Sequence, residues 1–195
     1  MTTSNRLDKA LHLIDEAHSQ DPTLTDSSTP YELHYAEKAT YYLNRLRRFP
    51  AAETLQLAVR AQHLRRWEVP RSTYPQTRAG YYAWRGYLGK RQAEIAEGLC
   101  REAGYTESEA GRVGQLIRKE GLGDDDPDTQ TLEDVACLVF LEDQLAKFAS
   151  GYDEEKVLGV LRKTWVKMSL AAHEMALGLD MEADMRWLVE KAVAG

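Results

Sequence analysis

The stretch LEDVACLVFLEDQLAKF, residues 132–148, is the most hydrophobic segment of this 195-residue chain. Its leucines at positions 138, 141 and 145 recur at intervals of three and four, which is the spacing of one face of an α-helix. Almost every other segment has the same period, and none has the sustained alternation typical of a β-strand. We therefore predict an all-α fold, a helical bundle.

The length of the chain is that of one domain with a substantial core. Apolar residues make up 43% and charged residues 29% of the sequence, as in ordinary folded proteins. We predict a single helical domain over residues 1–195, with a core at about 29–168 and C-terminal helices at 169–195 packed on it.

Helix-capping signals mark several of the expected helices. Thr29, followed by Pro30 and Glu32, has the pattern of a capping box at the start of the second helix. TESE, residues 106–109, has the same pattern at the start of the fifth. The third helix is expected to begin at Pro50 and to lie in the middle of the bundle, because its apolar residues point to nearly every side.

The cellular setting is inferred from what the sequence lacks. The first residues are polar, and no run reaches the roughly eighteen apolar residues that a membrane span needs. Cys100 and Cys137 lie in apolar helical patterns, which favours buried free thiols over a disulfide. We expect a cytoplasmic protein with no membrane partner.

The charge of the chain reverses along its length. The net charge is -6, yet residues 65–91 hold six Arg and one Lys against the single acid Glu68. This stretch therefore carries +6 and the remainder carries -12. A local reversal of this size is typical of a bound anion or an acidic partner.

Two polar residues lie on the inward faces of the two most hydrophobic predicted helices. His63 is four residues after Val59, and Asp134 shares a face with Leu138. A buried carboxylate needs a cation, a histidine or hydrogen-bond donors. One interpretation is a joint catalytic site. The other is a first-turn carboxylate that stabilises the helix N-terminus and a hydrogen-bonded core imidazole.

Parts of the sequence resemble the metal-dependent phosphohydrolases of the HD-domain superfamily. LHYAEKATYYL, residues 33–43, is similar to the helix with the first metal-binding histidine, which is matched by His34. LEDVACLVFL, residues 132–141, is similar to the stretch with the last metal-binding aspartate, matched by Asp134. The resemblance implies an all-α fold and a divalent metal, Mn, Fe or Mg, held by His63, Asp134 and His34.

More of the chain resembles an uncharacterised family, the domain of unknown function numbered four thousand two hundred and two. The similar stretches are RAQHLRRWEVPRSTYP at 60–75, TRAGYYAWR at 77–85, DPDTQTLEDVACLVFLE at 126–142 and LRKTWVKMS at 161–169. They cover most of the chain, and this resemblance implies no established activity.

The HD pattern is incomplete in this sequence. Leu64 stands where that superfamily has an aspartate next to its second histidine. Acidic residues that could substitute as ligands are Glu37, Glu68, Glu120 and Glu133. Glu133 joins His63 and Asp134 as a catalytic candidate, and the protein either holds a metal with such substitutes or holds none.

The basic stretch is interleaved with aromatic residues directly after His63. Its candidate ligand-binding residues are Arg65, Arg66, Trp67, Arg71, Arg78, Trp84 and Arg85. Guanidinium groups bind phosphate through two hydrogen bonds, and aromatic faces stack on bases. The alternative is a solvated helix whose aromatic side chains lie in the core.

These patterns predict an HD-like phosphohydrolase that acts on a nucleotide-like or other phosphorylated small metabolite. A metal at His63 and Asp134 would lower the pKa of a bound water, and the arginines would offset phosphoryl charge. The alternative is a non-catalytic helical module with a degenerate metal site that binds a nucleotide or RNA. A third possibility is a structural partner protein, and Leu64 favours the last two.

Overall fold

The computed structural model of the chain describes residues 3–47 and 50–194, and these residues form helices and no strand. The all-α prediction is confirmed. The chain divides into two compact units, the first ending at Leu132 and the second beginning at Glu133. The prediction of a single domain over residues 1–195 stays a prediction.

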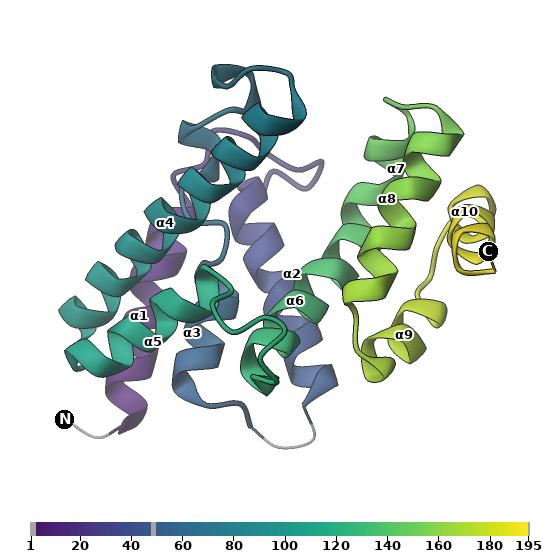
Figure 1. The fold of residues 1–195 in the computed structure, drawn as a ribbon. Coiled ribbons are helices and arrows are strands. Elements are labelled where there is room, and N and C mark those ends of the chain that lie inside the picture. Colours follow the sequence, from purple (N-terminus) through teal and green to yellow (C-terminus); the bar gives the residue numbers. More distant parts are fainter. Residues whose placement is uncertain (1–2, 48–49, 195) are drawn as a thin grey trace. The chain divides into compact units, whose positions relative to one another are not determined.

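Helices and two short 3-10 turns build the first unit (Figure 1). They are α1 (Thr3–His18), α2 (Tyr31–Leu46), α3 (Glu53–Ala61), η1 (Arg66–Glu68), η2 (Arg71–Thr73), α4 (Arg78–Ala103), α5 (Glu107–Ile117) and the start of α6 (Pro127–Val139).

Helix α3 lies in the centre of the first unit, as its sequence predicts. It contacts α1, α2, α4 and α5 (Figure 1). Leu55, Leu57 and Val59 are fully buried, and so is Leu64 just after the helix. Because α3 packs against four helices, these helices also place the segment that follows it.

Of the two predicted capping boxes, the one at Thr106 is confirmed and the one at Thr29 is wrong. The Thr106 side chain accepts from the backbone N–H of Glu109, and the Glu109 side chain accepts from the backbone N–H of Thr106. The Thr29 box is wrong, because Pro30 precedes the first residue of α2 and no side chain caps this helix. Glu32 is buried and bonds elsewhere, so its carboxylate is not available to Thr29.

The second unit contains the end of α6 and five further elements (Figure 1). They are η3 (Phe140–Gln144), α7 (Leu145–Ala149), α8 (Glu154–Lys167), α9 (Leu170–Leu177) and α10 (Ala183–Val193). Helix α8 contacts α7 and α10. The predicted continuous helix at 132–148 is interrupted, because Phe140–Gln144 adopts the wider turn of a π-helix.

The side chains of Cys100 and Cys137 are buried and are thiols rather than parts of a disulfide, as the sequence predicts. Burial raises the pKa of the Cys100 thiol to about 12, so this thiol is protonated at neutral pH. None of the described helices combines the length and the apolar character needed to cross a membrane.

We expect Thr106→Ala to lower the free energy of unfolding by about 1 kcal/mol, because it removes a side-chain cap from α5. The matched control is Thr29→Ala, for which we expect a change of less than about 0.5 kcal/mol, because Thr29 caps no helix. Urea denaturation followed by circular dichroism measures both. Equal losses for the two variants would contradict this account of the caps.

Candidate functional site

The basic stretch begins in a segment, residues 65–69, that hydrogen bonds tie to two helices. From α2, Glu32 Oε1 accepts from the Trp67 backbone N–H at 3.0 Å. From α4, Trp84 Nε1 donates to the Val69 carbonyl at 2.9 Å, and Arg91 donates to the Arg65 carbonyl at 3.1 Å. These contacts fix the turn that carries Arg66.

Arg66 and Arg85 are neighbours, and neither has a carboxylate at ion-pair distance among the residues that the structure describes. The Glu32 carboxylate acts on Arg66 from farther away. The Arg66 guanidinium lies over the Trp84 ring, 4.7 Å from its centroid. Burial lowers the pKa of Arg66, and the positive charge of Arg85 lowers it further. Arg85 is exposed. Two like charges held near each other without a carboxylate at ion-pair distance favour an anion at this place.

His63 lies beside these two arginines. Its ring stacks on Tyr35, with the ring centroids 3.7 Å apart and an interplanar angle of 18°. The pKa of His63 is well below its ordinary value, because burial disfavours the imidazolium and the charges of Arg66 and Arg85 add to this effect. The imidazole is therefore neutral at neutral pH, in surroundings that are already positive.

Other arginines of the basic stretch have partners within the protein. Arg71 donates to the carbonyl oxygens of Tyr74 and Pro75, so it holds its own loop together. Arg65 bonds to the side chain of Gln20 and lies 3.7 Å from Glu68. Of the predicted ligand-binding arginines, Arg66 and Arg85 are thus better placed for a ligand than Arg65 and Arg71.

The aromatic residues of the stretch take several positions. Trp84 is buried, and Trp67 contributes its backbone N–H to the contact with Glu32. Tyr81 is 44% exposed, and its ring centroid lies 6.1 Å from that of Trp84. The Arg78 guanidinium lies 5.6 Å from the Tyr82 ring centroid. Tyr81 was not among the predicted binding residues, although its spacing from Arg78 and Arg85 on α4 could have identified it.

Asp134, a predicted metal ligand, is buried in the second unit. Its Oδ1 accepts from the Ser169 backbone N–H at 2.8 Å and its Oδ2 from the Ser169 hydroxyl at 2.6 Å. Ser169 in turn caps α9. The neighbouring Glu133 lies 3.3 Å from Lys167 Nζ. These contacts give both carboxylates a role in holding the segment between α8 and α9.

The predicted metal-binding histidines belong to the first unit. His34 is half-buried on α2, with its ring 6.4 Å from that of Tyr31. That His63 and Asp134 share one site stays a prediction, as does the role of His34. Leu64, which stands where the resemblance to HD proteins would place an aspartate, is fully buried in the core. Within the described ranges, no group of three or more His, Cys, Asp or Glu side chains is arranged to hold a metal ion.

His18 and Glu32 are two buried residues connected to the 65–69 segment, and the sequence analysis did not include them among the site residues. His18 has no exposed surface, and its Nε2 lies 2.9 Å from the Arg60 carbonyl oxygen. Its Nδ1 lies 3.5 Å from Oε2 of Glu32. His18 follows Ile14 by four residues, so the apolar face of α1 could have identified it as buried. Glu32 was taken for part of a capping box.

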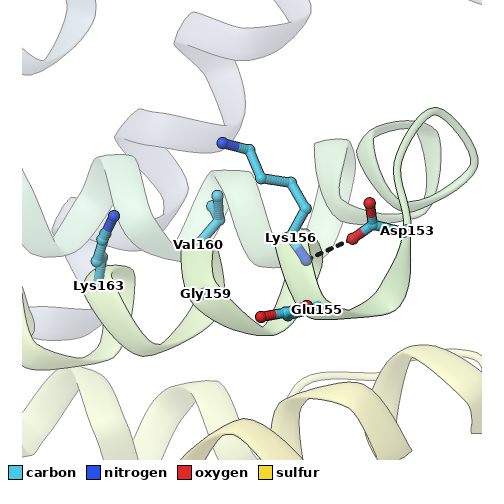
Figure 2. A pocket seen from close by; sticks show the side chains of 6 residues that line it. All are labelled: Asp153, Glu155, Lys156, Gly159, Val160 and Lys163. Carbon is cyan, nitrogen blue, oxygen red and sulfur yellow. Dashed lines mark hydrogen bonds between the residues drawn. The ribbon is translucent and has the colours of Figure 1, made fainter. Parts of the chain in front are cut away.

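A separate hollow of about 310 Å³ lies along α8 in the second unit. Figure 2 shows Lys156 and Lys163 on either side of Val160, and the hydrogen bond from the Lys156 backbone N–H to Asp153. The rest of its lining is Glu155 and Gly159. The hollow is lined by one helix and its cap, and charges of both signs surround it.

Comparison with known proteins identifies a family for the chain. No curated protein and no solved structure matches the sequence. The profile of one protein family, described as "Domain of unknown function (DUF4202)", matches residues 8–189. Because this match spans nearly the whole sequence, the chain belongs to the DUF4202 family.

Proposed function

We propose that the first unit binds the phosphate group of a small metabolite through Arg66 and Arg85. The observation that carries this proposal is that the two guanidinium groups are neighbours with no carboxylate at ion-pair distance among the described residues, although the protein as a whole is acidic. An anion between them would offset both their mutual repulsion and the partial burial of Arg66. Guanidinium also matches the geometry of phosphate oxygens.

The aromatic surroundings support a ligand with a planar ring, such as a nucleotide. Tyr81 is partly exposed close to Trp84, over which Arg66 lies. Aromatic side chains beside arginines suit a base that stacks while its phosphate is bound. The neutral His63 imidazole can donate a hydrogen bond to the same anion without adding a third positive charge.

The surroundings of His63 fit an anion better than a metal cation. A divalent cation on this imidazole would face the charges of Arg66 and Arg85, which already disfavour a proton there. Both oxygens of Asp134 accept hydrogen bonds from Ser169, so a metal would have to compete for them. We therefore propose a phosphate-binding module first, and metal-dependent hydrolysis through His63, Asp134, Glu133 and His34 stays a prediction.

We expect Arg66→Ala and Arg85→Ala each to weaken binding of orthophosphate and of adenosine monophosphate by about 1–3 kcal/mol, the cost of losing a charged hydrogen bond. Isothermal titration calorimetry measures this. The matched control is Arg101→Ala at the other end of α4, where Arg101 already pairs with Glu97 and Glu107. We expect this variant to bind as the wild type does.

Unchanged affinity in both site variants would contradict the proposal. Titration with single-stranded RNA at two salt concentrations separates a pocket from an open nucleic-acid surface. On such a surface each arginine would lower binding to many sequences and reduce its salt dependence.

We expect orthophosphate affinity to be the same with and without EDTA, and the same in Asp134→Asn, because the proposed contacts need no metal. Calorimetry in both conditions tests this. Elemental analysis and an assay for phosphate release from nucleotides accompany it. Phosphate release that disappears both in EDTA and in Asp134→Asn would instead establish the metal-dependent hydrolase.

A further inference from the structure

The turn that carries Arg66 is held from behind by a buried carboxylate. We infer that Glu32 is a positioning residue of the proposed phosphate site and that His18 holds Glu32 in place for this role. The inference rests on the proposed function, because it concerns how Arg66 is presented to an anion. It adds His18 from α1 and Glu32 from α2 to a site otherwise built from Tyr35, His63 and the basic stretch.

The contact between Glu32 and the turn is direct. Glu32 is 4% exposed, and its Oε1 accepts from the backbone N–H of Trp67, the residue after Arg66, at 3.0 Å. A buried N–H group that loses its acceptor is costly, so the turn is stable where Glu32 can reach it. The position of the Arg66 backbone therefore depends on a side chain of α2.

Glu32 is itself fixed at both ends. Its backbone N–H donates to Asp21 Oδ2 at 3.0 Å, and Asp21 Oδ1 accepts from the Thr23 N–H at 2.9 Å. At the other end, its Oε2 faces His18 Nδ1 at 3.5 Å. These contacts leave Oε1 directed at the turn.

The contacts of His18 define where its protons lie. A carbonyl oxygen can only accept, so His18 Nε2 carries a hydrogen that it donates to the Arg60 carbonyl. Nδ1 then faces a carboxylate oxygen, and two bare acceptors at this separation would repel each other. A proton on one of the two atoms removes this repulsion, and burial favours a protonated carboxyl by raising the pKa of Glu32 above its ordinary value.

The consequence for binding is preorganisation. Arg66 stays over Trp84 and near Arg85 only while the 66–68 turn is held in place. In a looser turn, Arg66 would become ordered only when the anion binds. The entropy lost in ordering it would lower the affinity. A purely structural Glu32 would affect the free energy of unfolding and leave affinity unchanged, so the two roles give different results.

The experiment compares Glu32→Gln with Glu32→Ala. The Gln amide oxygen can accept from Trp67 and its NH2 group can donate to a neutral His18, so we expect wild-type orthophosphate affinity. Glu32→Ala removes both contacts, and we expect affinity to fall about tenfold. Calorimetry measures affinity, urea denaturation measures stability, and the Trp67 amide resonance in ¹⁵N-labelled protein reports on the turn. It should shift strongly in Glu32→Ala and little in Glu32→Gln.

The matched control is Glu53→Ala. Glu53 is a partly buried carboxylate of the same unit that accepts from Arg6 and from the Tyr105 hydroxyl. We expect this variant to lose stability and keep its orthophosphate affinity. Should Glu32→Ala fail to fold, the double variant His18→Leu with Glu32→Met removes the acceptor without leaving a lone buried imidazole. The same tenfold loss is expected for it.

The outcomes separate this inference from the proposed function. If the wild type binds orthophosphate through Arg66 and Glu32→Ala binds equally well, the inference is overturned and the function stands. Equal losses of affinity in Glu32→Ala and Glu32→Gln would also overturn it, because the amide keeps the contact with Trp67. A wild type that binds no orthophosphate overturns both.

Discussion

The burial of α3 is the constraint on which the arrangement of the first unit depends. A helix of nine residues is marginal in water by itself, so α3 owes its stability to the helices packed around it. The same packing sets where the chain leaves α3, and hence where His63 and the basic segment begin. Leu64, fully buried at this exit, extends the apolar core to the edge of the proposed site.

Several arginines of the first unit form ion pairs with carboxylates of the protein, whereas the two arginines of the proposed site form none within the described chain. Arg60 forms a bidentate pair with Asp15, Arg112 pairs with Asp126, and Arg91 pairs with Glu68. Partners of this kind explain how an acidic chain keeps many of its arginines neutralised. Arg66 and Arg85 differ, because neither has a carboxylate at ion-pair distance among the described residues. Arg66 lies over the Trp84 ring, and the charge of Arg85 acts on it. The proposed anion binding would account for that difference.

The candidate site was predictable from the sequence in part. The excess of arginine after His63 identified the segment, because a run of one charge sign is visible without coordinates. This excess of arginine did not show that Arg66 is better placed for a ligand than Arg71. The difference arises from the fold of the Arg71 loop, whose carbonyl oxygens accept hydrogen bonds from the Arg71 side chain. Glu32 was assigned to a capping box because Thr29, Pro30 and Glu32 have the local pattern of one. In the structure, the Glu32 carboxylate instead accepts from the backbone N–H of Trp67, 35 residues away.

The sequence by itself determined the all-α class, the buried cysteines, the central α3 and the capping box at Thr106. Each follows from periodicity or from contacts within a few residues, and such contacts are encoded locally. Only the tertiary structure decided that His18 and Glu32 form a buried pair, that Asp134 accepts a hydrogen bond from Ser169, and that Phe140–Gln144 forms a π-helix. The physical reason is that a buried polar group takes whichever partner folding brings near it, and the most costly outcome is to have none.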